Sequence, residues 1–428
     1  MRRIVVTILA TMVALAIWAG AFLVGTSEGW WRRPLAPRGE TSAFMGATTA
    51  IIRKEAPGSL AFQLIEKGRP TDTTYVSRQR PVDGDTRFQV ASLSKWITAW
   101  GVMTLVEDGK IDLDAPVDTY LKRWKLPPSK FDNRQVTVRR LLSHTAGLTD
   151  GLGYFGFEPG KPVQPLPESL TRASDASPGA DGRVRVGKKP GAGWVYSGGG
   201  YALMQLMIED VTGESFEAYM QRAVLAPLGM SRSTFVLPES GAENLAGFYD
   251  AKGGPAIHYR FSAPSAASLY TSSADLTRFI QAHLPGPDGA QPGRGILSPK
   301  TLRDMRQPHA SQLGADIWGL GVVLYAPNGT GDFIIGHDGG NVPAINTSAR
   351  FDPASGDGII VLESGSPRLA SVIAGEWVFW RTGKVDNVTF LLELRQTLKT
   401  LAIGGLLILL AAVALSWLTR RRQPRLAR

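Results

Sequence analysis

The chain has 428 residues, of which 43% are hydrophobic and 20% are charged, a composition typical of folded globular proteins. Its formal net charge is +10, but seven arginines lie at the extreme ends, and subtracting them from +10 leaves +3. The positive charge therefore belongs to the two tails and does not predict a nucleic-acid-binding surface. The chain has no cysteine, which excludes disulfides, thiolate nucleophiles and cysteine zinc sites. We expect no metal and no cofactor, since no two of the five histidines have helical i, i+4 spacing.

The N-terminal end is hydrophobic. An uncharged run of 24 residues extends from Ile4 to Ser27, and roughly 20 apolar residues are enough to cross a membrane. A signal peptide cleaved after Ala21 is the alternative. Uncharged sequence continues to Trp30 and Trp31, which would suit the membrane interface, so we favour an uncleaved anchor. We assign residues 1–29 to this anchor or signal peptide.

A linker rich in Arg, Pro and Gly is expected at residues 30–46, before a globular region at 47–382. Apolar alternation predicts a strand over 59–68, and nearly all-round hydrophobicity predicts a central buried helix over 92–107, ended by a glycine cap. The remaining predictions are helices over 201–210 and 216–225, and strands over 319–325, 332–335, 347–351 and 358–362. Strands at both ends with helices between them predict an α+β fold, in which an antiparallel sheet is built from both ends and a helical lobe is inserted.

The C-terminal end repeats the pattern of the N-terminal end. A juxtamembrane segment, 383–399, precedes an uncharged run over 400–419, and a basic tail follows at 420–428. The positive-inside tendency would place the arginines of both ends in the cytoplasm. We therefore predict a protein of the cell (inner) membrane that contacts lipid through two terminal transmembrane helices, with its globular domain extracytoplasmic.

Ser92 and Lys95 begin the predicted central helix. Lysine is rarely buried without a partner, yet this one precedes Trp96 and Ile97 on a helix with no polar face. Residues three apart share a helix face, so the amine should lie near the hydroxyl. Desolvation would lower the pKa of the amine and allow it to accept the serine proton at neutral pH. The alternative is a capping serine followed by a lysine that extends to solvent.

Several segments resemble the β-lactamase-related serine hydrolases, which include class C β-lactamases, D-alanyl-D-alanine carboxypeptidases and esterases. The resemblance covers most of residues 50–365 and rests on four stretches in order: FQVASLSKWITA, VTVRRLLSHTAGL, GAGWVYSGGGYALM and IIGHDGGNVP. It implies a β-lactamase/transpeptidase-like (penicillin-binding-protein-like) fold. It also implies that His144, in the second stretch, is structural.

The same resemblance implies roles for individual residues. Ser92 would be the nucleophile, and Lys95 and Tyr196 would share proton transfer; which of the two is the base stays open. The backbone N–H groups of Ser92 and Gly340 would form the oxyanion hole. His337 and Gly339 lie on the strand that closes the site, where family members carry Lys-Thr-Gly or His-x-Gly, and we assign them to substrate binding. A buried structural role is the alternative for His337.

The chain departs from the family pattern at one element. The common Tyr-x-Asn is here Tyr196-Ser197-Gly198, so the amide that usually orients substrate and lysine is missing. This departure, with His337 in place of lysine, favours esterase or peptidase chemistry over β-lactam turnover.

We therefore predict a membrane-anchored serine hydrolase that forms an acyl-enzyme on Ser92 with esters, D-amino-acid peptides or related amides. Its partner would be a small-molecule or peptide substrate, and the sequence leaves its oligomeric state open. Three alternatives remain: a catalytically idle binding or sensor domain, a β-lactamase proper, and an enzyme that mainly transfers its acyl group to an acceptor amine.

Overall fold

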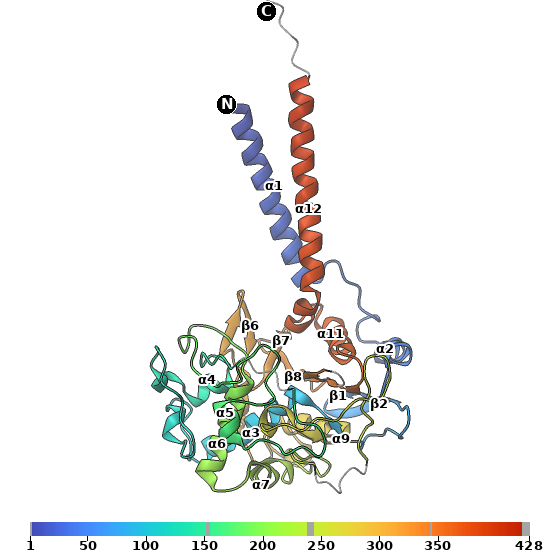
Figure 1. Cartoon of the computed structure of the whole chain (residues 1–428). Coiled ribbons are helices and arrows are strands. Elements are labelled where there is room, and N and C mark those ends of the chain that lie inside the picture. The colour runs from blue at the N-terminus through green and yellow to red at the C-terminus, as the bar shows by residue number, and fades with distance from the viewer. Residues whose placement is uncertain (1, 151–154, 238–243, 343–344, 422–428) are drawn as a thin grey trace, which may run out of the picture.

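Two long terminal helices project side by side from one side of an α+β domain in the computed structural model (Figure 1). The structure describes residues 2–150, 155–237, 244–342 and 345–421. The projecting helices are α1 (Arg2–Ser27) and α12 (Asn387–Arg421). The rest of the described chain forms the domain at their base.

The domain is built on one antiparallel sheet. Within the described residues the sheet has eight strands, in the order β2-β1-β10-β9-β8-β7-β6-β5. The strands are β1 (Leu60–Glu66), β2 (Arg69–Val76), β5 (Ala310–Gln312), β6 (Ala315–Trp318), β7 (Val323–Pro327), β8 (Phe333–Asn341), β9 (Ile345–Phe351) and β10 (Gly358–Ser364). Because β1 pairs with β10, the sheet joins both ends of the domain, as the sequence predicted. A separate short pair, β3 (Phe88–Gln89) and β4 (Tyr270–Thr271), lies outside it.

Helices cover both faces of the sheet, and each face has its own core. On β1, Leu60, Phe62 and Leu64 are buried against one face, whereas Ala61 and Ile65 belong to the core on the other. Alternate residues of a strand point to opposite faces, so a strand buried on both faces is apolar throughout. One core involves α2 (Thr41–Glu55) and α11 (Leu369–Thr382), and the other involves the helical lobe.

The helical lobe is inserted between β2 and β5 and contains the central helix. Its helices are η1 (Ala91–Leu93), α3 (Ser94–Glu107), η2 (Val117–Thr119), η3 (Asn133–Gln135), α4 (Val138–Leu142), α5 (Leu166–Thr171), α6 (Gly198–Thr212), α7 (Phe216–Met220), the π-helical turn η4 (Gln221–Leu225), α8 (Pro264–Ala267), α9 (Ser273–Ala282), η5 (Pro287–Gly289) and α10 (Pro299–Met305). Trp96 and Trp100 of α3 are buried, which confirms that this helix is central.

Several element boundaries differ from those predicted. Helix α2 starts inside the segment assigned as a linker, because Phe44 packs against Trp380 at a ring-centroid distance of 4.7 Å and is fully buried. The strand predicted over 319–325 is interrupted: β6 ends at Trp318 and β7 begins at Val323. The sequence analysis did not predict β2 or α11.

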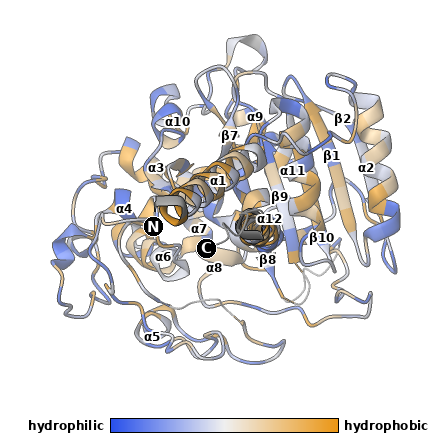
Figure 2. Ribbon diagram, turned by 90° about the horizontal axis from the view of Figure 1, so that it is seen from above, coloured by the Kyte–Doolittle hydropathy of each residue, from blue (hydrophilic) through white to orange (hydrophobic). Residues whose placement is uncertain are grey.

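The terminal helices are long and apolar enough to cross a membrane by length and composition, over Ile4–Ser27 and Asn387–Leu418. Viewed from above, both helices stand over the domain (Figure 2). They contact each other: Trp18 Nε1 donates a hydrogen bond to the Leu401 carbonyl oxygen at 3.1 Å. Gly404 permits this approach, since a Cβ there would overlap the indole of Trp18.

Candidate active site

The turn that carries Ser92 has a constrained backbone. Ala91 has φ +45°, a left-handed conformation that costs energy in a residue with a Cβ. Thr347 on β9 donates a hydrogen bond from Oγ1 to the Val90 carbonyl oxygen at 2.9 Å. Gly339 on β8 packs so closely on the same carbonyl that a Cβ at that position would overlap it. The two central strands thus hold the turn before Ser92, which itself stays half-buried at the end of a cavity.

Lys95 lies one turn after Ser92, and the two side chains meet as the spacing predicted. Its Nζ donates to Ser92 Oγ at 3.1 Å and to the Ala266 carbonyl oxygen at 2.7 Å. The lysine is 2% exposed. Burial lowers the pKa of Lys95 from 10.5 to about 7, against the opposing influence of the Asp150 carboxylate. A substantial fraction of the amine is therefore neutral at neutral pH, as general-base function requires.

Tyr196 completes the group. It forms a side-chain hydrogen bond with Ser92, and its ring centroid lies 5.1 Å from Lys95 Nζ. Its ring is partly open to solvent, whereas desolvation of the hydroxyl raises the pKa of Tyr196 well above its ordinary value. The neutral phenol therefore prevails and can donate or relay a proton.

His144 positions the segment that carries Tyr196. Its Nδ1 accepts a hydrogen bond from Ser197 N at 3.1 Å, and its ring packs 4.4 Å from that of Tyr196. A ring nitrogen that accepts from an amide is unprotonated. Burial, together with the nearby Lys95 charge, lowers the pKa of His144 well below its usual value. This geometry is that of the structural histidine implied by the resemblance.

Asp150 is a site residue that the sequence analysis missed. Its Oδ2 accepts hydrogen bonds from the Ser197 hydroxyl and from Gly199 N, the latter at 2.6 Å. The buried carboxylate thus fixes the start of α6 directly after Tyr196 and also acts on the charge of Lys95. No local pattern identifies it, because Asp150 and Ser197 are far apart in the sequence.

A cavity of about 760 Å³ opens onto the three residues. Apart from Ser92, Lys95 and Tyr196, its lining consists of Ala91, Phe155, Ser177, Gly198, Asp250, Ala251, Lys252, Ala267, Gly340, Asn341, Val342, Ile345 and Pro367. Gly198 lines the cavity but has no side chain. The side-chain amide of the family pattern is therefore absent here, as the sequence implies. The cavity therefore combines an apolar wall with two charged residues, Asp250 and Lys252, that the sequence analysis did not single out.

The structure places the residues of the closing strand in two groups. Gly340 is exposed and lines the cavity. His337 is 3% exposed, and neither it nor Gly339 lines the cavity. His337 Nδ1 lies 2.6 Å from the Asp338 carbonyl oxygen, and burial lowers the pKa of His337 to about 4. In this structure the His337 imidazole lies inside the protein, as in its alternative structural role, and Gly339 packs on Val90. The assignment of both residues to substrate binding stays a prediction.

In the part of the chain that the structure describes, no three His, Asp or Glu side chains are grouped so that they could hold a metal ion. The site places a hydroxyl beside a largely neutral amine and a neutral phenol. Such a group can transfer an acyl group through a covalent serine ester.

The fold and this site are those of the β-lactamase-fold serine hydrolase family, which includes penicillin-binding proteins and esterases. The model of the beta-lactamase family matches residues 48–377. The chain therefore belongs to the beta-lactamase family.

Individual relatives agree with this assignment. The chain is 32% identical over 299 residues to penicillin-binding protein 4 of Amycolatopsis lactamdurans, an alignment that covers 66% of this chain and 74% of the relative. It is 30% identical over 284 residues to the esterase EstB of Burkholderia gladioli, covering 56% and 67% respectively. The octameric penicillin-binding protein homologue from Pyrococcus abyssi has a similar fold, with a TM-score of 0.65 at 24% identity over 81% of this chain and 78% of that one.

Proposed function

We propose that the protein is a membrane-anchored serine hydrolase that cleaves esters, D-amino-acid peptides or related amides through an acyl-enzyme on Ser92. The observation that carries this proposal is the 3.1 Å hydrogen bond between Lys95 Nζ and Ser92 Oγ, made by an amine whose pKa burial lowers to about 7. An isolated capping serine and a solvent-exposed lysine would have neither property.

In the proposed reaction, Ser92 Oγ attacks the substrate carbonyl carbon while its proton passes to Lys95 or Tyr196. The N–H groups of Ser92 and Gly340 stabilise the oxyanion, since preorganised donors are most effective where charge develops. The proton then passes to the leaving group, and water or an acceptor amine releases the acyl group. The intact Ser92–Lys95–Tyr196 contact argues against a catalytically idle domain.

The residues that line the cavity favour an esterase or peptidase over a β-lactamase proper. Gly198 supplies no side-chain amide, and His337 is buried away from the cavity. The substrate would instead be held by the apolar wall of Phe155, Val342 and Ile345. The similarity to an esterase and to a penicillin-binding protein is consistent with this choice.

The proposed anchor consists of α1 and α12, with the catalytic domain extracytoplasmic and both basic ends in the cytoplasm. Their apolar length and mutual packing support it. Trp30 and Trp31 are 62% and 64% exposed just beyond α1, where an interfacial aromatic belt would lie. The substrates would then be extracytoplasmic, such as cell-wall peptides or exported acylated molecules.

The test is covalent labelling of the full chain in detergent with a fluorophosphonate, followed by peptide mapping. We expect stoichiometric modification of Ser92 and none in Ser92→Ala. Ser177→Ala is the matched control, because Ser177 lines the same cavity on another segment. A panel of short-chain esters, D-amino-acid peptides and nitrocefin then ranks the substrates. A folded wild-type chain that labels no better than Ser92→Ala would contradict the proposal.

A further inference from the structure

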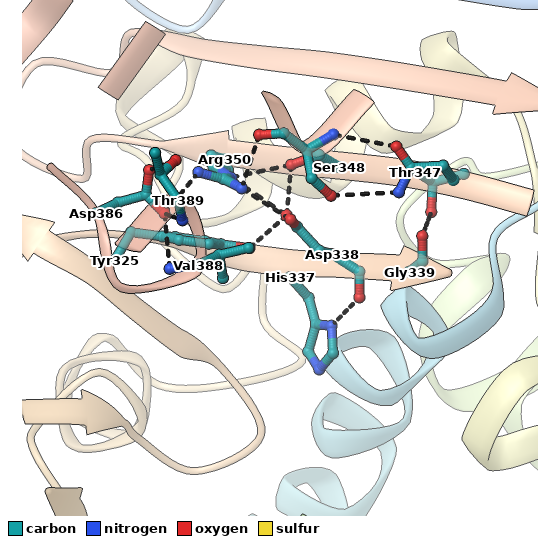
Figure 3. Close-up of polar contacts among 12 residues, drawn as sticks. Tyr325, His337, Asp338, Gly339, Thr347, Ser348, Arg350, Asp386, Val388 and Thr389 are labelled. Carbon is teal, nitrogen blue, oxygen red and sulfur yellow. Dashed lines mark hydrogen bonds and ion pairs between the residues drawn. The ribbon is translucent and has the colours of Figure 1, made fainter. Parts of the chain in front are cut away.

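A buried arginine connects the strand that closes the active site with the first turn of α12 (Figure 3). Arg350 on β9 is fully buried. Its Nη2 lies 2.7 Å from Asp338 Oδ2 on β8, and its Nη1 lies 3.2 Å from Asp386 Oδ1, directly before α12. The guanidinium also stacks on Tyr325, 3.9 Å from the ring centroid. We call Asp338, Arg350 and Asp386 the buried bridge.

On β8, the buried bridge holds the side chain of Asp338, two residues before Gly340, which we propose for the oxyanion hole. Asp338 Oδ1 accepts hydrogen bonds from Tyr325 Oη at 2.7 Å and from Ser348 Oγ at 2.5 Å, in addition to Arg350. The next two residues, Gly339 and Gly340, have no side chains. β8 stays paired with β9 at Gly340↔Asn346, so Asp338 is the side chain through which the bridge can act on the direction of the Gly340 N–H.

On the helix side, Asp386 is built into the start of α12. Its Oδ1 accepts from Val388 N at 2.9 Å and from Thr389 N at 3.0 Å, and its Oδ2 accepts from Thr389 Oγ1 at 2.6 Å. Asn387 Nδ2 donates to the Leu324 carbonyl oxygen on β7 at 2.8 Å. The first turn of α12 is thus bonded to the catalytic sheet and is not attached only through a loop.

The connection between the sheet and α12 is made by charged groups. Two carboxylates share one guanidinium; Arg350 and Asp386 are fully buried, and the Asp338 side chain is 16% exposed. Removal of one partner leaves the others poorly compensated. If α12 served only to attach the domain to a membrane, it would need no buried bridge, because apolar contacts with α11 could hold it.

We propose that Arg350 is a positioning residue that sets the Gly340 N–H through Asp338, so that docking of α12 on the sheet is part of building the active site. This inference rests on the proposed function for its catalytic consequence. It predicts that weakening the bridge at α12 slows acylation at Ser92, although Asp386 does not line the cavity.

The test uses Asp386→Asn in the full chain, which removes the charge but keeps an oxygen that can cap α12. The matched control is Asp210→Asn. Asp210 is also a buried carboxylate paired with an arginine, since its Oδ1 lies 2.5 Å from Arg123 Nε, and it accepts from Lys122 N at 2.6 Å. It lies on α6 of the helical lobe and does not line the active-site cavity.

For Asp386→Asn we expect a fluorophosphonate labelling rate about ten-fold lower and KM for an ester within two-fold of wild type, on the scale of losing part of one oxyanion donor. We also expect several-fold faster hydrogen–deuterium exchange in the peptide 333–341. Asp210→Asn should change neither the labelling rate nor the exchange of this peptide, even if it lowers the melting temperature as much as Asp386→Asn does. Arg350→Lys keeps the charge but cannot reach both carboxylates, so it should also slow labelling and speed exchange. The double variant Arg350→Lys/Asp386→Asn should show no larger changes than either single variant.

Wild-type labelling and wild-type exchange in Asp386→Asn would overturn the inference, as would equal changes in Asp210→Asn. If Arg350→Lys does not fold, Asp386→Asn decides alone. Hydrogen exchange needs no catalysis, so a wild-type chain that fails to label refutes the proposed function, while the 333–341 peptide still reports on the bridge.

Discussion

The amine of Lys95 lies 3.1 Å from the hydroxyl of Ser92 and is almost completely buried. Burial lowers the pKa of this lysine to about 7, so the amine must lose a proton near neutral pH before it can act as a base. This contact makes the pH dependence of acylation the most direct probe of the proposed chemistry.

Acylation of Ser92 should accelerate as the pH rises through about 7 and level off above it, because the neutral amine is the active form. The measurement is the rate of fluorophosphonate labelling from pH 5 to 9. Lys95→Ala should remove this dependence and lower the rate by about 10²–10⁴-fold. A wild-type rate that falls with increasing pH would show that Lys95 does not act as the base in its neutral form.

Tyr196→Phe should also lower the acylation rate, by up to about 10²–10⁴-fold, because the substitution removes a proton-transferring hydroxyl and leaves the ring. Its stability should change little, since the ring contacts with His144 are retained. The measurement is single-turnover cleavage of an activated ester, with the melting temperature as a control. Unchanged turnover would assign Tyr196 a packing role only.

Gly339→Ala should largely abolish labelling, because its Cβ would overlap the Val90 carbonyl oxygen and displace the turn that carries Ser92. Gly46→Ala on α2 is the control, because a Cβ there would meet nothing within 4 Å and Gly46 does not line the cavity. The two variants should therefore differ sharply in labelling rate. Similar rates would mean that the turn tolerates movement of β8.

Glu363→Gln should stabilise the protein more at pH 8 than at pH 5. Burial raises the pKa of Glu363 from 4.5 to about 8, so between these values the unfolded chain releases a proton that the folded chain retains. Stability is then full below the unfolded pKa and is lost as the pH rises towards 8. Melting temperatures of the variant and of the wild type at both pH values measure the effect. A larger gain at pH 5 would contradict the assignment.

The membrane topology is testable with reporters in cells. A reporter fused after Arg428 should behave as cytoplasmic, and one inserted near Pro178 as extracytoplasmic, because the basic ends stay on the cytoplasmic side. An N-terminal tag that remains attached indicates an uncleaved anchor, and one that is lost indicates cleavage after Ala21. A middle domain protected from external protease would overturn the topology and leave the site chemistry untouched.

Local sequence determined the parts of the protein that depend on short-range geometry. Ser92 and Lys95 are one helical turn apart, so their contact follows from the spacing alone. The apolar run of β1 and the caps at Gly109 and Gly213, both with positive φ, follow from periodicity and from the freedom of glycine. The sheet built from both ends followed from the order of the strands.

Only the tertiary structure decided which face of β8 each residue of the closing strand occupies. A one-residue change of strand register moves every side chain to the opposite face, and no local signal fixed that register for His337. Long-range pairing likewise brought Asp150 to Ser197 and placed Arg350 between Asp338 and Asp386. Asp150 lies 47 residues from Ser197, and Asp386 lies beyond α11 from Arg350. These polar groups are stable only where burial brings their partners together, which no single stretch of the chain encodes.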